Sequence, residues 1–439
     1  MRKKAAAVKN IIIPLISGFM LLFIFNCASI SIGGVRVLSR GPLIVNEPSE
    51  EGVIATTDIL INGFFWVIRQ WKDGKLATVD GWGRFAEISF ESETRVTLRT
   101  LMEYPRSQQD NWGFLTWPEA GLMVSKVIGT HFLADINNNI TKTQSPMGMF
   151  SFYWANKEGD PVLLDAEQGI IAYVYNHGNN GWDRSQRSIT ATSLYIYDYK
   201  NDTMIFESPE LHSRNEKDEK TFTLGINAAI NNELVLAYHR VFYDDRRSRD
   251  NFLYNWRTRE IIRNDLTNAI NKSDVSISID PFINFNANKR ILIGSIGGAE
   301  REHFKIDWDE NFSNVKITNL SYLIPAGQRF AGSFIFSSCG SWATTQIYGS
   351  LRINGKSMYK RAFFHIDEKY PNGISEAIYG DDYEEYDNGF LYNAFVNHPI
   401  YGWCLAQKGA DILSNKRAEY LRLYKMEDVL AEIDKRQEK

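Results

Sequence analysis

The residues best suited to bind a charged partner are arginines and aromatic residues in two long connections between predicted strands. Arginine makes paired hydrogen bonds to carboxylates and phosphates, so this group suits an anionic partner: a glycan, an acidic peptide or a lipid headgroup. Its six members are Trp182, Arg184, Arg187, Tyr243, Arg246 and Arg247. The alternative is a solubilising surface, because Asp183, Asp244 and Asp245 lie among them.

Pairs of acidic residues come closest to a catalytic arrangement. Hydrolysis of a glycosidic bond needs two carboxylates that face one pocket, and pairs occur at Asp244-Asp245, Asp381-Asp382 and Glu384-Glu385. A solvated acidic loop is the simpler explanation of each pair. The sequence contains no Gly-x-Ser-x-Gly nucleophile elbow and no phosphate-binding loop. It therefore indicates a binding or scaffold protein, with a glycan hydrolase as the alternative.

No cluster of residues has the spacing of a metal site. The seven histidines are scattered, and no Cys-x-x-Cys or Cys/His zinc spacing occurs. Asp307, Asp309 and Asn311 match the start of a calcium loop, but neither a glycine-bearing frame nor a closing Glu follows. Turn formation by these side chains is the simpler reading. We expect no metal and no cofactor.

The N-terminus has the features of an export signal. Four basic residues among the first nine precede the apolar run Ile11–Phe25, which is shorter than the about 20 residues that a membrane-spanning helix needs. The next residues, ending in Asn26-Cys27, resemble the lipobox of bacterial lipoproteins, in the relaxed form similar to that of spirochaetes. The resemblance implies cleavage before Cys27 and acylation of that residue. The alternative is a signal anchor with an incidental cysteine.

Cleavage at this point divides the chain into a signal peptide (1–26), a lipidated tether (27–51) and a folded body (52–435). Ala28 replaces the Asp that holds many such lipoproteins at the inner membrane, so the resemblance implies the outer membrane or the cell surface. The mature chain has 45 basic and 53 acidic residues, a net charge of −8, which argues against nucleic-acid binding. The expected partners are the membrane, through the lipid, and a protein or glycan.

A strand–turn–strand pattern repeats along the body and is clearest at Leu194–Glu207. The residues that close the first strand of each copy lie 46 to 63 positions apart. They are Ser89, Asp135, Asp198, Asn255, Asp307, Asp367 and Lys425. Each interval also contains an earlier strand pair, and four strands per unit are typical of a propeller blade. The sequence therefore predicts an all-β fold, a single β-propeller of seven four-stranded blades, at roughly 52–105, 106–155, 156–208, 209–264, 265–322, 323–380 and 381–435.

A parallel β-helix and two stacked β-sandwiches are the alternative folds, and the regular spacing favours the ring over both. In such a ring the connections between second and third strands share one face, which places the six predicted binding residues together. A hydrolase would instead carry its carboxylates in the central funnel. After signal cleavage Cys339 and Cys404 remain, and both a disulfide and two buried thiols are open to them.

Overall fold

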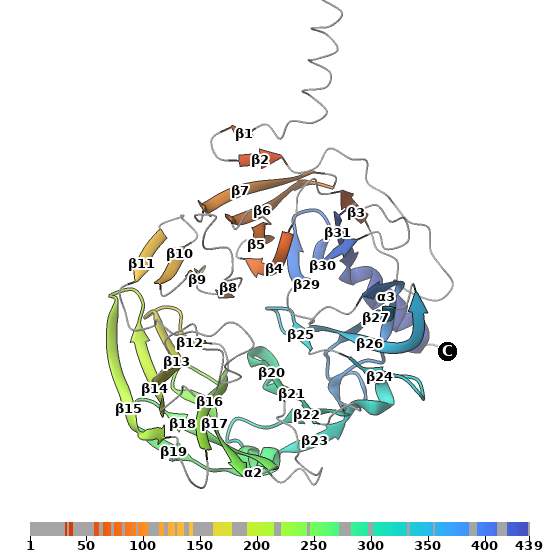
Figure 1. Cartoon of the computed structure of the whole chain (residues 1–439). Coiled ribbons are helices and arrows are strands. Elements are labelled where there is room, and N and C mark those ends of the chain that lie inside the picture. Colours follow the sequence, from red (N-terminus) through yellow and green to blue (C-terminus); the bar gives the residue numbers. More distant parts are fainter. Residues whose placement is uncertain are drawn as a thin grey trace, which may run out of the picture.

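The structure is a computed structural model. It describes residues 31–32, 35–37, 57–60, 65–71, 74–80, 84–93, 95–103, 114–117, 122–127, 130–135, 140–143, 161–177, 191–214, 221–243, 246–271, 282–296, 302–331, 334–353, 356–385, 393–410 and 419–437. These residues form antiparallel sheets that follow one another around a ring (Figure 1). The prediction of an all-β propeller is confirmed.

The first four blades each run outward from an inner strand to an outer one. Blade 1 contains β4 (Phe65–Trp71), β5 (Lys75–Asp80), β6 (Arg84–Ser92) and β7 (Arg95–Glu103). Blade 2 contains β8 (Phe114–Trp117), β9 (Leu122–Val127), β10 (Thr130–Asp135) and β11 (Ile140–Thr143). Blade 3 contains β12 (Val162–Asp165), β13 (Ile170–His177), β14 (Ala191–Asp198) and β15 (Thr203–Arg214). Blade 4 contains β16 (Thr221–Ala229), β17 (Leu234–Tyr243), β18 (Arg246–Asn255) and β19 (Glu260–Ile262).

Blade 5 keeps this plan, whereas blades 6 and 7 depart from it. Blade 5 contains β20 (Phe282–Asn286), β21 (Ile291–Ile296), β22 (Glu302–Asp307) and β23 (Lys316–Asn319). Blade 6 has a divided first strand, and contains β24 (Arg329–Phe330), β25 (Ile335–Phe336), β26 (Trp342–Ile353), β27 (Lys356–His365) and β28 (Ile378–Glu385). Blade 7 contains β29 (Asn393–His398), β30 (Gly402–Ala410), β31 (Glu419–Lys425) and β3 (Thr57–Leu60). The helices are α2 (Asp265–Asn271), α3 (Met426–Gln437) and the short turns η6 (Ala287–Lys289), η7 (Leu320–Leu323) and η8 (Pro371–Gly373).

The repeated hairpin is the outer half of a blade, because its two strands are the third and fourth of the sheet. In Leu194–Glu207 these strands are β14 and β15, and the Asp198 carboxylate accepts hydrogen bonds from the backbone N–H of Lys200 (2.9 Å) and Asn201 (3.0 Å). Asn255 caps its own turn in the same way. Asp198 and Asn255 therefore act as turn formers, since their side chains bond amides two or three residues ahead.

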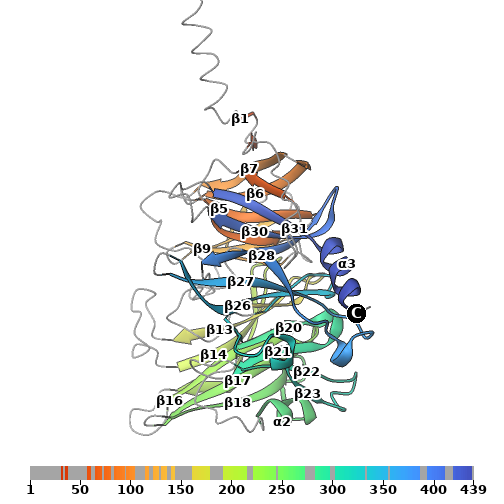
Figure 2. The same ribbon diagram turned by 90° about the vertical axis from the view of Figure 1, so that its right-hand side faces the viewer.

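The ring closes because a strand from the start of the folded body completes the last blade. Strand β3 pairs with β31 in the seventh sheet, with Ile59 opposite Leu421, although the expected blade bounds assign this segment to blade 1. The seventh hairpin therefore differs from its six relatives, because its outer position is already occupied. The chain leaves β31 as α3, which packs beside β28, β30 and β31 (Figure 2).

The core lies between neighbouring blades and not within any one of them. In blade 4, alternate residues of β17 point to opposite sides: Val235 and Ala237 pack against blade 3, whereas Leu236 packs toward blade 5. Successive side chains of a strand point to opposite faces, so a strand buried on both faces must be apolar at consecutive positions. This explains the continuous apolar runs of the inner strands.

A short hairpin adds to the outer edge of blade 1. It consists of β1 (Ser31–Ile32) and β2 (Val35–Val37), and β2 pairs with β7, with Arg36 opposite Leu98. The sequence predicts a tether over 27–51, and the described residues of this region form these two strands, docked on the propeller. Among the described helices, none combines the length and apolar character required to cross a bilayer.

Candidate binding site at the channel mouth

The predicted binding residues are only partly within the described residues. Trp182, Arg184, Arg187 and the predicted lipidation site, Cys27, lie outside them. Tyr243, Arg246 and Arg247 lie at the ends of β17 and β18, where Tyr243 is the backbone partner of Arg246 and Phe242 that of Arg247. The structure thus brings three of the six together at one end of blade 4, and their role in binding stays a prediction.

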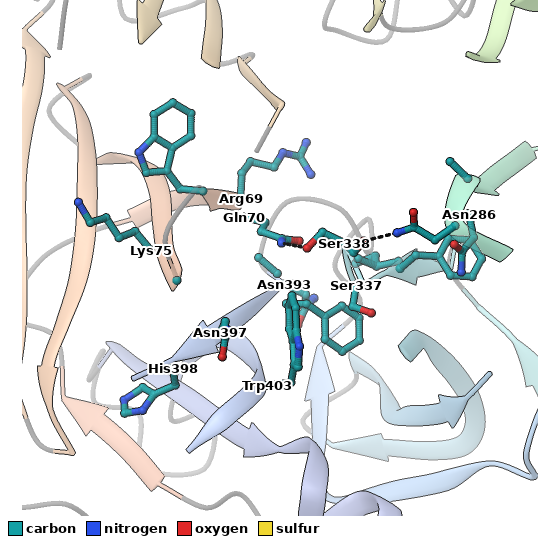
Figure 3. Close-up of a pocket in the computed structure, with 18 of the residues that line it drawn as sticks. Arg69, Gln70, Lys75, Asn286, Ser337, Ser338, Asn393, Asn397, His398 and Trp403 are labelled. Atoms are coloured by element: carbon teal, nitrogen blue, oxygen red, sulfur yellow. Dashed lines mark hydrogen bonds between the residues drawn. The ribbon is translucent and has the colours of Figure 1, made fainter. Parts of the chain in front are cut away.

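A different group of residues lines a cavity at the mouth of the central channel. The volume of this cavity is about 1350 Å³. Blades 1, 3, 5, 6 and 7 all contribute to it, mostly through residues near the turns that join first and second strands. The polar and charged lining residues are Arg69, Gln70, Lys75, Ser89, Asn286, Asn288, Ser337, Ser338, Asn393, Asn397 and His398, most of which are shown in Figure 3. These turns lie at the end of the strands opposite to the β17–β18 connection, so the cavity and the predicted binding loops occupy opposite faces.

One turn crosses the channel mouth. Residues Ser337–Ser341, here called the channel strap, join β25 to β26 and reach both blade 5 and blade 1. On the blade 5 side, Asn286 donates to the Gly340 carbonyl (2.6 Å) and Asn288 to the Ser338 carbonyl. On the blade 1 side, Gln70 Nε2 donates to Ser338 Oγ (2.7 Å; Figure 3). Because blade 7 lies between blades 6 and 1, this last bond connects two blades that are not neighbours in the ring.

Positive charge dominates the lining. Arg69 and Lys75 line the cavity, and no Asp or Glu stands among the described residues that do so. Glu87 lies behind the wall, 3% exposed, where its carboxylate is 3.2 Å from Lys75 Nζ and 3.0 Å from a guanidinium nitrogen of Arg99. Trp71 Nε1 donates to the same carboxylate (3.0 Å). The Glu87 carboxylate is therefore paired with Lys75 and Arg99 behind the cavity wall.

His398 is a structural residue of the rim. Its Nδ1 accepts hydrogen bonds from the backbone N–H of Ile400 and Tyr401 (both 3.1 Å), and its ring stacks on Tyr401 with centroids 4.6 Å apart. Burial disfavours the charged imidazolium and lowers the pKa of His398 to about 4. The ring is therefore neutral at pH 7, with its proton on Nε2.

The cysteines and the calcium-like spacing have other roles. Cys339 and Cys404 are both free thiols, and burial raises the pKa of Cys404 to about 12. Asp309 accepts bonds from the backbone N–H groups of Asn311 and Ser313, and Asp307 is paired with Lys305, so both serve local structure. Within the described ranges, no three His, Cys, Asp or Glu side chains gather as a metal ion would require.

The sequence does not indicate the channel residues, because they are dispersed along the chain. The lining runs from Arg69 to Trp403, and only closure of the ring brings these positions together. The one local signal is the small-residue segment Ser337–Ser341, whose short side chains permit a turn to enter the channel. Gly340, with φ +77°, packs so closely on Asn286 that an added Cβ would lie 2.7 Å from its Oδ1.

Comparisons with known proteins match the fold but not the sequence. No family model matches the chain, and no curated protein matches it. Similar solved structures include an oligogalacturonate lyase from Vibrio parahaemolyticus, with a TM-score of 0.50 and 10% identity over 89% of this chain and 98% of that one. An oligogalacturonate lyase in complex with manganese also has a TM-score of 0.50, with 12% identity over 89% of this chain and 100% of that one. At these identities the likeness shows that the chain has the β-propeller fold.

Proposed function

We propose that this chain is a lipid-anchored binding protein of the cell envelope, and that the cavity at the channel mouth is its recognition site. The observation that carries the proposal is a large opening to which five blades contribute, and which blades 1, 5, 6 and 7 line with amide, hydroxyl and cationic side chains. A ligand site typically combines apolar walls with a few convergent polar groups. Phe336, Phe395 and Trp403 supply such walls here.

Binding is favoured over glycan hydrolysis because the described lining residues offer no acid–base pair. Glycosidases of the usual type place two carboxyl groups about 5–9.5 Å apart on either side of the scissile bond. The described lining residues include no carboxylate, and nearby Glu87 already interacts with Lys75 and Arg99. The hydrolase alternative thus lacks its central requirement at this cavity.

Recognition is tested by closing the cavity. Asn397 is exposed at the rim, so Asn397→Trp should block entry without disturbing the core. The matched control is Asn268→Trp, which changes an exposed position on α2, away from the cavity. Carbohydrates are the first ligands to screen on an array, since two similar propellers are named as oligogalacturonate lyases. Ligands bound by the native chain and the control but not by Asn397→Trp support the proposal, whereas equal binding by all three contradicts it.

The lipid anchor has its own test. Cells grown with a clickable palmitate analogue should label the native chain and the Cys339→Ser control, while Cys27→Ser should lose the label. Retained labelling of Cys27→Ser would overturn the lipoprotein assignment.

The loop arginines provide a second contact in this proposal. Arg246→Glu with Arg247→Glu should weaken binding of an anionic protein or glycan partner, because two attractive charges become repulsive. Unchanged binding to a verified anionic partner would leave these residues as solubilising surface charge.

A further inference from the structure

Several polar side chains at the channel mouth already hold the channel strap in place. The side-chain amides of Asn286 and Asn288 donate to backbone carbonyls of the strap. The Gln70 amide donates to the Ser338 hydroxyl at 2.7 Å. These groups therefore position the strap, and the surface that the mouth offers an incoming molecule depends largely on its apolar side chains.

The two cations of the described lining are also engaged within the chain. Lys75 Nζ lies 3.2 Å from the Glu87 carboxylate, and Arg69 has an interaction of its own. His398 is uncharged near neutral pH, because burial lowers its pKa to about 4. A ligand therefore needs no charged group to balance these residues.

Apolar side chains from blades 3, 5, 6 and 7 line the cavity and remain partly exposed. They are Leu163, Phe285, Ile335, Phe336 and Trp403. An apolar ligand would remove their surface from water, which is the main driving force of protein association. The volume of about 1350 Å³ exceeds the roughly 300–1,000 Å³ of sites for drug-sized ligands, so the cavity has room for more than one side chain.

The apolar surface continues outside the cavity on the turn between β29 and β30. Pro399 lines the cavity, and the next residue, Ile400, is 51% exposed, the highest value among the large hydrophobic side chains of the described residues. His398 Nδ1 accepts the backbone N–H groups of Ile400 and Tyr401 (both 3.1 Å), so the turn holds Ile400 in a fixed position. A small molecule enclosed by the cavity would leave Ile400 in water, whereas a protein segment can fill the cavity and also cover its rim.

The amide groups at the mouth suit a peptide backbone. Gln70 and Asn288 use their NH₂ groups on the strap, so each keeps a carbonyl oxygen that can accept a backbone N–H. Asn397 is exposed on the rim and offers both a donor and an acceptor. A hydrocarbon chain could cover the apolar walls, but it would take these groups out of water without giving them partners.

We infer that the channel mouth receives an apolar segment of a protein partner. Aliphatic or aromatic side chains of the segment fill the cavity, and an adjoining residue packs on Ile400. Anchors of this kind, buried in a pocket and surrounded by contacts that exclude water, provide most of the binding energy of protein interfaces. The inference rests on the proposed function and adds the class of partner to it.

The test uses a phage-displayed library of random dodecapeptides, selected on the full-length chain in lipid nanodiscs after empty nanodiscs have removed membrane-binding phage. Enriched peptides are synthesised, and their dissociation constants are measured by fluorescence anisotropy. They should share an aliphatic or aromatic anchor, and replacing that anchor with Ala should weaken binding by at least about tenfold.

Two variants place the bound peptide at the mouth. Asn397→Trp should abolish binding because it blocks entry, and Ile400→Ser should weaken binding by about fivefold because it removes a rim contact. The matched control is Ile205→Ser, which changes an isoleucine that is 41% exposed on β15, outside the cavity. This control should bind the peptides within about twofold of the native chain. Circular dichroism spectra of each variant establish that the fold is retained.

Three results overturn the inference. They are the absence of any enriched peptide, enriched peptides that bind equally well after their apolar residues are replaced with Ala, and native affinity for these peptides in Asn397→Trp or Ile400→Ser. If no peptide is enriched but a carbohydrate or a fluorescent fatty acid binds the native chain and not Asn397→Trp, the recognition site stands and only the class of partner is wrong. If none of these probes binds at the mouth, the proposed function fails as well.

Discussion

Gly74 lies where blade 1 meets blade 7 at the edge of the cavity, and replacing it should weaken ring closure. Its φ is +71°, a conformation that costs other residues about 1–3 kcal/mol. A Cβ built on Gly74 would lie 2.1 Å from the backbone oxygen of Asn397. Backbone of the neighbouring blade cannot move aside as a flexible side chain can, so overpacking adds roughly 1–3 kcal/mol. We expect Gly74→Ala to lower the free energy of unfolding by about 2–6 kcal/mol.

Gly327 isolates the contribution of this contact. Its φ is +83°, but a Cβ there would meet nothing within 4 Å, so Gly327→Ala should show the backbone strain alone. Urea denaturation followed by tryptophan fluorescence gives both values under the same conditions. Gly74→Ala should be the more destabilised variant by at least about 1 kcal/mol. Equal destabilisation of the two would refute the close approach of blades 1 and 7.

Three further predictions concern buried polar groups. The pKa of His398 falls from 6.5 to about 4 on folding, so the unfolded chain binds more protons between these values and stability is lost as the pH drops from 6.5 toward 4. His398→Asn keeps a side-chain acceptor for the backbone amides of Ile400 and Tyr401. As the pH drops through that range, urea titrations should show the free energy of unfolding of this variant falling by up to about 3 kcal/mol less than that of the native protein. An equal fall in both proteins would contradict the assignment. Iodoacetamide should label Cys339 in the folded chain and reach Cys404, buried and with a pKa of about 12, only after denaturation; prompt labelling of Cys404 would show an open blade 7. Gln346 is fully buried, and its amide atoms have no partner among the described residues, so Gln346→Met should leave the free energy of unfolding unchanged or raise it by about 1 kcal/mol; a clear loss would reveal a satisfied amide.

The fold could be predicted from the sequence because the same strand–turn–strand pattern recurs along the chain. Asp198 and Asn255 mark strand ends, since they bond the amides of the turn that follows. The exception at Lys425 also has a visible signal: Met426, Val429 and Ile433 follow a helical period and are buried on one face of α3. The pairing of β3 with β31 had no such signal, because nothing local in Thr57–Leu60 specifies a partner at the far end of the chain.

The candidate site was harder to predict from the sequence than the fold was. The predicted binding residues were chosen for their types within two connections, whereas the cavity gathers single residues from five blades. Gln70 and Ser338 are 268 positions apart and meet only in the closed ring. Convergence of this kind depends on topology and not on local pattern.

The most direct test of the channel mouth as recognition site is a crystal structure of the full-length chain with a ligand identified by the array screen. The ligand should lie between Trp403 and the channel strap, within hydrogen-bonding distance of Gln70. A ligand bound on the opposite face, beside Tyr243 and Arg246, would contradict it.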